Sequence, residues 1–229
     1  MQTVLITGAN RGIGLALTRK FLEAGDSVIA CCRDPAKAAA LHAMKQGGKL
    51  EILPLEVTSA DSVAALAKAV GSRTVDVLIN NAGIMGGEQQ DSNNMDYAAW
   101  LHTFEVNTLS PFRVTMALLP ALQRSSKARV ITVSSQMGAF GLDMGFGRYA
   151  YRTSKTAASK TMQLLAAELK SQNIIVCPVH PGWVQTDMGG PGAQITPEAS
   201  ASGLQQLINS LTMAESGRFW TWEGKEHVW

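Results

Sequence analysis

The sequence has no long apolar run and little net charge, and each shortage excludes a class of partner. No apolar segment within the 229 residues approaches the ~20 that a membrane-spanning helix needs. The formal net charge is only +2, and lysine and arginine form no cluster of the kind that attracts nucleic acid. We therefore expect neither a membrane nor a nucleic acid as partner.

Cysteine is scarce as well. The three cysteines are Cys31, Cys32 and Cys177, and a bridge between the adjacent pair would be badly strained. We expect buried thiols in a reducing compartment. The chain enters a strand directly after Met1, which leaves no room for a signal peptide, so we expect a cytoplasmic location. No repeat or linker divides the chain, and its length suits one domain, residues 1–229.

Strands and helices alternate along the whole sequence. The apolar patterns predict strands at residues 3–7, 27–32, 50–55, 75–79, 129–134, 174–179 and 218–220. They predict helices at 13–24, 35–45, 58–70, 97–123 with a break allowed at Pro111, 150–171 and 196–211. This alternation predicts an α/β fold, a doubly wound parallel sheet (Rossmann fold) of about seven strands with helices on both faces.

A glycine-rich turn follows the first strand directly. Gly8, Gly12 and Gly14 stand between that strand and a helix that Gly25 ends. Glycines in this place allow a tight turn and let the backbone approach a pyrophosphate, which then lies at the helix N-terminus. The alternative is a tight strand-to-helix turn with no ligand.

The end of the second strand bears on the choice of dinucleotide. In a dinucleotide fold this end meets the adenosine ribose, where an acidic residue binds a free 2′-hydroxyl and an arginine suits a 2′-phosphate. The strand ends in Cys32-Arg33, and Arg11 projects from the glycine turn toward the same region. Asp34 argues for NAD(H), but we expect it to cap the helix that Pro35 opens. The prediction is NADP(H).

The most informative pair is Tyr151 and Lys155. Their four-residue spacing places both side chains on one face of a helix. A phenol titrates at about pH 10, and a nearby positive charge would lower its pKa toward the working range. A tyrosine tuned in this way can protonate a carbonyl oxygen or accept the proton of an alcohol. Any amphipathic helix can carry such a pair, so its weight depends on the surrounding motifs.

Polar residues also follow three later strands. They are Asn80-Asn81-Ala82-Gly83, Ser134-Ser135 and His180-Pro181-Gly182. Open α/β sheets bind ligands at these carboxyl ends. The asparagines could equally form a simple turn, Asn107 could be an exposed residue within a helix, and His180 is better explained as a capping or buried histidine than as a base.

Two loops supply candidates for a substrate pocket. Residues 136–148 form a connection that is unusually apolar for a loop, with Leu142, Met144 and Phe146 among its residues, and residues 183–195 form a second loop with four glycines. An apolar pocket is therefore predicted, with no fixed cation for a carboxylate or phosphate. Its predicted residues are Met137, Phe140, Trp183 and Met188.

From Thr3 to the C-terminus, these motifs resemble those of the short-chain dehydrogenase/reductase family. The stretch 7–14 matches its cofactor turn and 80–83 its sheet-bracing motif. Asn107, Ser135, Tyr151 and Lys155 match its catalytic tetrad in order and context. Residues 180–190 and 217–220 are similar to the C-factor-like and sniffer-like carbonyl reductases within the family.

The resemblance implies hydride transfer between a nicotinamide and a carbonyl or secondary alcohol of a small apolar molecule. Lys155 would hold the nicotinamide ribose and lower the pKa of Tyr151, which would donate the proton. Ser135, rather than Ser134, would stabilise charge on the carbonyl oxygen, and Asn107 would kink its helix and hold a water. A dinucleotide sensor or developmental signalling protein is the alternative.

The resemblance also implies the cofactor-binding residues and the assembly. Glu56 stands where many family members have aspartate, which changes the reach of the carboxylate. The family often pairs through helices that here span 97–123 and 150–171, so a homodimer or homotetramer is expected. Three tryptophans lie near the C-terminus, Trp220, Trp222 and Trp229, and they are predicted to pack on the substrate loop or on a second subunit. No metal site is predicted. The implied cofactor-binding residues are Gly8, Asn10, Arg11, Gly12, Ile13, Gly14, Arg33, Glu56, Val57, Asn81, Ala82, Gly83, Tyr151, Lys155, Pro181, Gly182, Val184 and Thr186.

Overall fold

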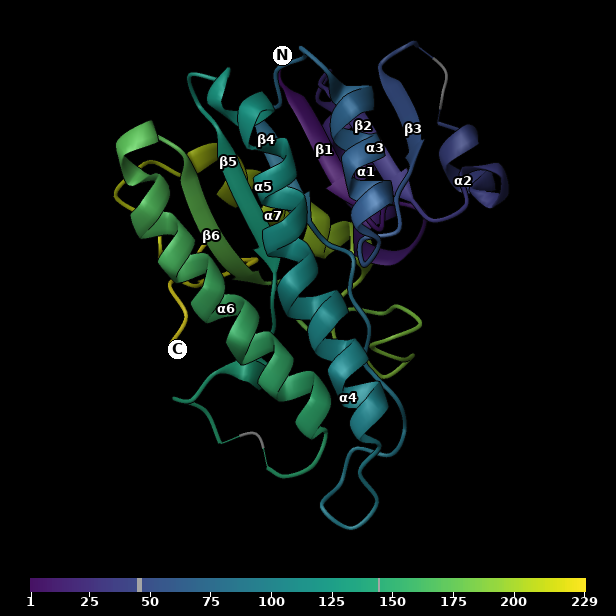
Figure 1. Ribbon diagram of the computed structural model, residues 1–229, viewed down its shortest axis with the longest axis vertical. Coiled ribbons are helices and arrows are strands. Elements are labelled where there is room, and N and C mark those ends of the chain that lie inside the picture. Colours follow the sequence, from purple (N-terminus) through teal and green to yellow (C-terminus); the bar gives the residue numbers. More distant parts are fainter. Residues whose placement is uncertain (45–46, 144) are drawn as a thin grey trace.

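A computed structural model describes residues 1–44, 47–143 and 145–229, and these contain a seven-stranded sheet (Figure 1). The strands are β1 (Thr3–Thr7), β2 (Ser27–Cys32), β3 (Leu50–Pro54), β4 (Val77–Asn80), β5 (Arg129–Val133), β6 (Ile175–His180) and β7 (Trp220–Thr221). Their order is β3-β2-β1-β4-β5-β6-β7, and every neighbouring pair is parallel. The predicted doubly wound sheet is confirmed. The order changes direction between β1 and β4.

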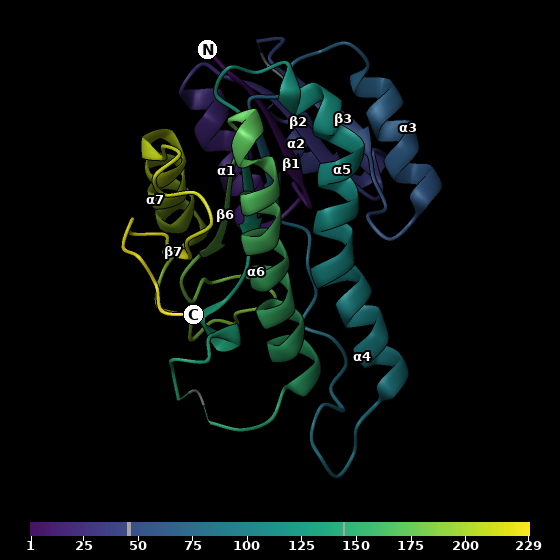
Figure 2. The same ribbon diagram turned by 60° about the vertical axis from the view of Figure 1, so that its left-hand side comes forward.

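Helices cover both faces of the sheet, as predicted. The helices are α1 (Gly12–Glu23), α2 (Ala39–His42), α3 (Ala60–Val70), α4 (Tyr97–Phe104), α5 (Ser110–Gln123), α6 (Tyr149–Leu169) and α7 (Pro197–Ser210). Figure 2 separates α1 and α7 on one face from α3, α5 and α6 on the other. Phe21 and Leu204 belong to the first apolar core, whereas Leu118 and Leu165 belong to the second.

The two cores meet the sheet through alternating strand residues. In β1, Val4 and Ile6 enter the core under α1 and α7, and Leu5 enters the other. Successive side chains of a strand point to opposite faces, so a strand covered by helices on both sides is apolar at nearly every position. The three cysteines are buried free thiols, as expected. In the described ranges, no helix is long and apolar enough to cross a membrane.

Three helices begin where the sequence places a capping side chain. Ser59, Asp96 and Thr196 accept hydrogen bonds from main-chain N–H groups at the starts of α3, α4 and α7. These bonds satisfy donors that the first helical turn leaves without partners. Of the two hydroxyl residues at the start of the predicted helix, Thr58 and Ser59, the structure uses Ser59 as the cap.

The predicted helix at 35–45 is wrong in form. A short 3-10 turn, Pro35–Lys37, is followed by the single-turn α2, and Ala38 between them has a non-helical ψ of 57°. Lys45 lies outside the described residues. Asp34 makes no side-chain capping bond, because its carboxylate pairs with the ammonium of Lys37 at 3.0 Å. The hydrogen bond to Lys37 lowers the pKa of Asp34.

The helix at 97–123 deviates before the predicted break at Pro111. Residues Glu105–Leu109 form a π-helical turn between α4 and α5, with Asn107 at its centre. Pro111 has no N–H to donate to the carbonyl four residues earlier, which belongs to Asn107. The wider π turn therefore precedes the proline. The family resemblance implies that Asn107 kinks its helix, and the structure shows a π-helical turn at this position.

The C-terminal tail packs against the body of the chain. The Trp229 carbonyl accepts a hydrogen bond of 2.7 Å from Gly141 N–H in the apolar loop. The Trp229 ring lies 5.9 Å from that of Phe219, which is buried. Trp220 and Trp222 pack against the core under α1 and α7. The first predicted option, packing on the substrate loop, is confirmed for Trp229.

Candidate active site

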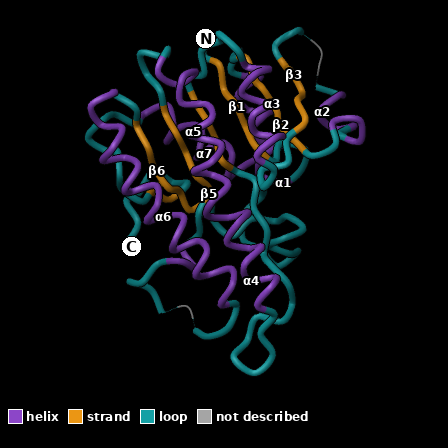
Figure 3. The backbone as a smooth tube through the Cα atoms, viewed as in Figure 1, coloured by secondary structure: helices purple, strands orange, loops and turns teal. Residues whose placement is uncertain are grey.

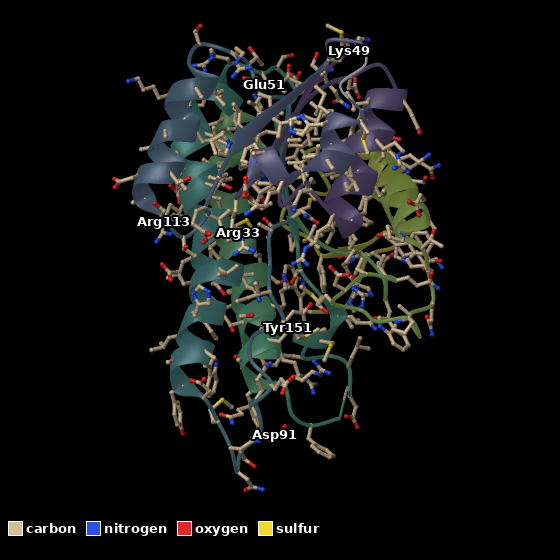
Figure 4. All side chains as sticks on the ribbon, turned by 90° about the vertical axis from the view of Figure 1, so that its right-hand side faces the viewer. Arg33, Lys49, Glu51, Asp91, Arg113 and Tyr151 are labelled. Atoms are coloured by element: carbon tan, nitrogen blue, oxygen red, sulfur yellow. The ribbon has the colours of Figure 1, made fainter. Side chains whose placement is uncertain are left out.

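The predicted site residues gather beyond the carboxyl ends of the strands. Figures 1 and 3 show the long loops collected at this end, where α4 and α6 extend past the sheet. In Figure 4, Tyr151 lies between Arg33 and the loop that carries Asp91, far from Lys49 and Glu51 at the opposite end of the sheet. This is the edge at which parallel α/β sheets bind ligands.

The glycine turn is held in place by Asn81. Its Nδ2 donates to the carbonyls of Thr7 and Gly8 at 2.9 and 3.0 Å. The Thr7 hydroxyl in turn accepts from the N–H groups of Asn81 and Ala82, both at 3.0 Å. Gly8 has a φ of +64°, and a side chain on Gly14 would collide with the Gly8 carbonyl. The turn therefore depends on glycine and on the asparagine amide. The neighbouring Asn80 points away, toward α5, where its amide donates to Thr115.

Three candidates near the ribose end lie at the surface of this edge. Arg33 is exposed directly after β2. Arg11, predicted to project toward the same region, is instead paired with Asp187 of the 183–195 loop at 2.7 Å. The Glu56 carboxylate accepts two hydrogen bonds from Thr58, its N–H and its hydroxyl, and thus folds back on its own loop. Val57 is buried beside it.

The segment after β6 covers the glycine turn. Thr186 approaches it so closely that a Cβ on Gly12 would lie 3.1 Å from the threonine methyl. The Pro181 carbonyl accepts a hydrogen bond from Ser200, and Val184 is buried where it pairs with Ile195. The structure thus brings the predicted cofactor-binding residues after β6 and the glycine turn together.

Tyr151, Lys155 and Ser135 lie together and are buried. The Ser135 side chain acts on the Tyr151 phenol and opposes the rise of its pKa. Lys155 Nζ donates to the Val133 carbonyl at 2.8 Å and lies 5.8 Å from the centre of the Tyr151 ring. Ser134 faces the other way, donating to the Lys155 carbonyl at 3.1 Å and bonding to Ser159. Only Ser135 of the serine pair reaches the phenol, as the strand geometry predicts.

Burial controls the titration of this group. It raises the pKa of Tyr151, and the neighbouring Ser135 hydroxyl and the charge of Arg148 oppose that rise. It lowers the pKa of Lys155 to about 8. The sequence predicted a lowered tyrosine pKa, and the structure gives the opposite direction because removal from water disfavours the phenolate more than the neighbours stabilise it.

Asn107 connects the tetrad to the end of β4. Its side chain accepts from Ile84 N–H at 2.9 Å and donates to the Ile84 carbonyl and to Ser154. Gly83 passes between Asn107 and Lys155, since a Cβ there would lie 3.2 Å from Asn107 Oδ1 and 3.4 Å from Lys155 Nζ. A side chain would fill this space, so the glycine keeps a polar opening next to the lysine. Such an opening, lined by donors and acceptors, fits the ribose hydroxyls of a dinucleotide.

His180 is a buried histidine, as the sequence favoured. Its Nδ1 accepts a hydrogen bond of 3.3 Å from Gln136 N–H. Burial and the neighbouring His227 lower the pKa of His180 to about 4. At neutral pH the ring is therefore uncharged and carries its proton on Nε2. The histidine fixes the turn after Ser135.

The predicted pocket residues are not assembled into one pocket. Met137 is half-buried beside Ser135, whereas Trp183 and Met188 are exposed on the 183–195 loop. Phe140 is 86% exposed and borders a different cavity of about 460 Å³, between α6 and the tail. Met144, in the same loop, lies outside the described residues. Sequence reasoning missed Gln90, a buried loop residue bonded to the Tyr151 main chain.

The fold and site define a class of protein, a dinucleotide-binding α/β fold with a buried tyrosine, lysine and serine at its switch point. The sequence model of the family described as short chain dehydrogenase matches residues 2–194. The chain belongs to the short-chain dehydrogenase family, and it is an oxidoreductase.

Similar proteins support this assignment. "C-signal" of Myxococcus xanthus is 41% identical over 165 residues, which cover 72% of this chain and 99% of that protein. The carbonyl reductase Sniffer of D. melanogaster has a TM-score of 0.95 and 30% identity, covering 100% of both chains. The NADPH-bound carbonyl reductase from chicken fatty liver has a TM-score of 0.93 and 33% identity, covering 100% of this chain and 99% of that one.

The buried lysine should cost stability in a pH-dependent way. Below a pH of about 8 the folded chain must hold a buried ammonium, so Lys155→Met should raise the free energy of unfolding at pH 7, by roughly 1–3 kcal/mol. Between about 8 and 10.5 folded Lys155 loses its proton while the unfolded chain keeps it, so the wild type gains stability and the difference narrows. Urea denaturation of the wild type and of Lys155→Met across this pH range measures the difference between their free energies of unfolding. A difference independent of pH would contradict the prediction.

Proposed function

We propose that the chain is an NADP(H)-dependent oxidoreductase that interconverts a carbonyl and a secondary alcohol of a small apolar molecule. The observation that carries the proposal is the burial of Tyr151, Ser135 and Lys155 together at the carboxyl edge of the sheet, with Lys155 Nζ 5.8 Å from the centre of the Tyr151 ring. The similarity to carbonyl reductases supports the reaction class. The half-buried Met137 beside Ser135 supports an apolar substrate.

The proposed chemistry divides among four side chains. The bound nicotinamide supplies or accepts the hydride. Tyr151 carries the proton to the carbonyl oxygen, and its raised pKa keeps the phenol in the acid form that reduction needs at neutral pH. Ser135 donates to the same oxygen and stabilises its developing charge. Lys155 binds the ribose hydroxyls, and Asn107 holds a water near the lysine.

Removal of the Tyr151 hydroxyl tests this function. Tyr151→Phe keeps the ring, so we expect a folded protein that binds NADPH normally and whose carbonyl-reducing turnover falls by at least ~10². Loss of NADPH absorbance with a panel of aldehydes, ketones and quinones measures turnover. Tyr149→Phe removes a hydroxyl two residues away on a ring that is 42% exposed, and it should retain turnover. Near-normal turnover in Tyr151→Phe would contradict the assignment of Tyr151 as the residue that transfers the proton.

The preference for NADP(H) is assigned to Arg33. The exposed guanidinium follows neutral Cys32, and the nearby Asp34 carboxylate is already paired with Lys37. A 2′-phosphate accepts paired hydrogen bonds from a guanidinium. Arg11 can contribute only by leaving Asp187, so its part is secondary. The chicken protein that this fold matches was solved with NADPH.

Arg33→Ala should therefore weaken NADPH binding selectively. A hydrogen bond to a charged group contributes roughly 1.5–3 kcal/mol, and exposure favours the low end, so the NADPH dissociation constant should rise about tenfold. The NADH constant should change little. Fluorescence titration of both dinucleotides measures this, with Arg218→Ala in the C-terminal segment as control. If the unmodified protein binds NADH with the same affinity as NADPH, then Asp34 rather than Arg33 determines which ribose is recognised.

A second candidate function is signalling. The similarity to the Myxococcus protein named "C-signal", at 41% identity, is the observation that favours it. The complete set of tetrad side chains at the site supports catalysis over a sensor that only binds a dinucleotide. Measurable turnover with the carbonyl panel separates the two, because a pure sensor binds the cofactor without consuming it.

We also propose that the chain forms a homodimer or homotetramer through α4, α5 and α6. Large apolar side chains are exposed on these adjacent helices, including Leu101 at 74% and Leu164 at 60%. Burying them between subunits would remove apolar surface from water.

Charges on this face should separate the subunits. Phe112→Glu combined with Leu164→Glu places two carboxylates where apolar side chains would be buried, so the mass measured by light scattering should fall to that of one chain. Phe146→Glu, at an exposed position in the apolar loop, is the control and should leave the mass unchanged. A wild-type protein that is already monomeric would contradict the proposal.

A further inference from the structure

The helix that carries Tyr151 begins without a cap of its own. The residue before α6, Arg148, adopts the left-handed region with φ 53° and ψ 41°, and its side chain makes no capping hydrogen bond. The first N–H groups of a helix have no partner within the helix. Tyr151 is the third residue of α6, so its N–H must be satisfied from elsewhere.

Gln90 supplies that partner across 61 residues of sequence. Its Oε1 accepts from Tyr151 N–H at 3.0 Å. Its Nε2 donates to the carbonyls of Met85 and Gly87 at 2.9 and 2.5 Å. The orientation of the amide follows from these partners, because two carbonyls require the NH₂ end and an N–H requires the oxygen. Gln90 is only 4% exposed, and the amide nitrogen and oxygen are both bonded.

The loop around this amide is shaped to hold it. Gly86 has a φ of +86°, and a Cβ there would lie 2.7 Å from Thr103 Oγ1 and 3.2 Å from Gln90 Nε2. The same loop begins at Gly83 and Ile84, where Asn107 bonds to the main chain. Gln90 thus stands between the segment that leaves β4 and the first turn of α6. A second link is the bond from Tyr149 N–H to the Gln90 carbonyl.

We propose that Gln90 is a positioning residue for Tyr151: its side-chain amide fixes the start of α6 to the loop after β4 and thereby sets where the phenol lies relative to the residues of that loop. The inference rests on the proposed function, in which Tyr151 transfers the proton. A displacement of about 1 Å at a reacting group can cost ~10² in rate, so an anchor of this kind matters for turnover.

The first variant removes all three hydrogen bonds of the Gln90 side chain. In Gln90→Leu, the kcat and the kcat/KM for a carbonyl substrate should fall together by at least about tenfold, because proton transfer rather than substrate binding is affected. Hydrogen exchange at the Tyr151 amide should accelerate by at least about tenfold, since its acceptor is gone. Gln89→Leu makes the same chemical change at an exposed neighbour and should alter neither quantity.

The second variant separates the two ends of the amide. Gln90→Glu keeps an acceptor for Tyr151 N–H but faces the Met85 and Gly87 carbonyls with an oxygen. Protonation of the introduced carboxyl restores one donor, and burial beside two carbonyls raises its pKa. The ratio of the variant kcat to the wild-type kcat should therefore rise severalfold as the pH falls from roughly 8 to roughly 5.5. This ratio removes the pH dependence of Tyr151 itself.

The outcomes distinguish this inference from the proposed function. If the unmodified protein reduces no carbonyl, the proposed function fails, and exchange at the Tyr151 amide still tests the anchor. Unchanged exchange in Gln90→Leu would overturn the proposal. So would a folded Gln90→Leu protein with wild-type kcat, or a Gln90→Glu ratio that is flat with pH. If Gln90→Leu does not fold, the pH-dependent ratio for Gln90→Glu decides.

Discussion

The site depends on one side-chain amide that joins β1 to β4. The strand order changes direction between these two strands, which is the place where open α/β sheets bind ligands. Asn81 ties the two strand ends together there by donating to the carbonyls of Thr7 and Gly8, while the Thr7 hydroxyl accepts two N–H groups in return. Without the amide, two main-chain carbonyls beneath the glycine turn would lose these partners, at a cost of roughly 1–3 kcal/mol each where they are shielded from water. These bonds between Asn81 and the end of β1 set the positions of the glycine turn, Gly83 and the tetrad.

The ionisation of Tyr151 and Lys155 is set by their burial rather than by an attraction between a phenolate and an ammonium. The sequence suggests a lysine that draws a proton off its tyrosine neighbour, but Lys155 Nζ is bonded to the Val133 carbonyl and is itself shifted toward its neutral form. Both groups are therefore pushed toward zero charge. For the proposed reduction this direction is useful, because a protonated phenol is the acid. In the proposed reaction, the predicted stability cost of burying Lys155 would accompany a proton donor that the fold holds in place.

Long-range architecture was predictable because it follows from repeated local patterns. Alternating apolar strands and amphipathic helices require parallel crossovers, and parallel crossovers bring every strand end to one edge. The motifs after β1, β4, β5 and β6 therefore had to meet, and they do. The prediction of a helix at 35–45 was wrong for the opposite reason. Its alanines favour a helix by propensity, but among its described residues, 35–44, only Ala38 and Leu41 are buried, so packing stabilises no more than one turn.

Contacts between distant segments could not be predicted, and Arg11 shows why. Its position in the glycine turn was known, but its pairing with Asp187 depends on how the 183–195 loop folds back. The role of Gln90 is hidden in the same way, because a polar residue in a polar loop gives no sign that it will be buried. One sequence signal was nevertheless present. The four residues directly before Tyr149 (145–148) include no serine, threonine, aspartate or asparagine, so the helix that bears Tyr151 had no local cap. Since buried N–H groups are almost always bonded, an uncapped helix start beneath the buried Tyr151 predicts a distant side chain that supplies the bond.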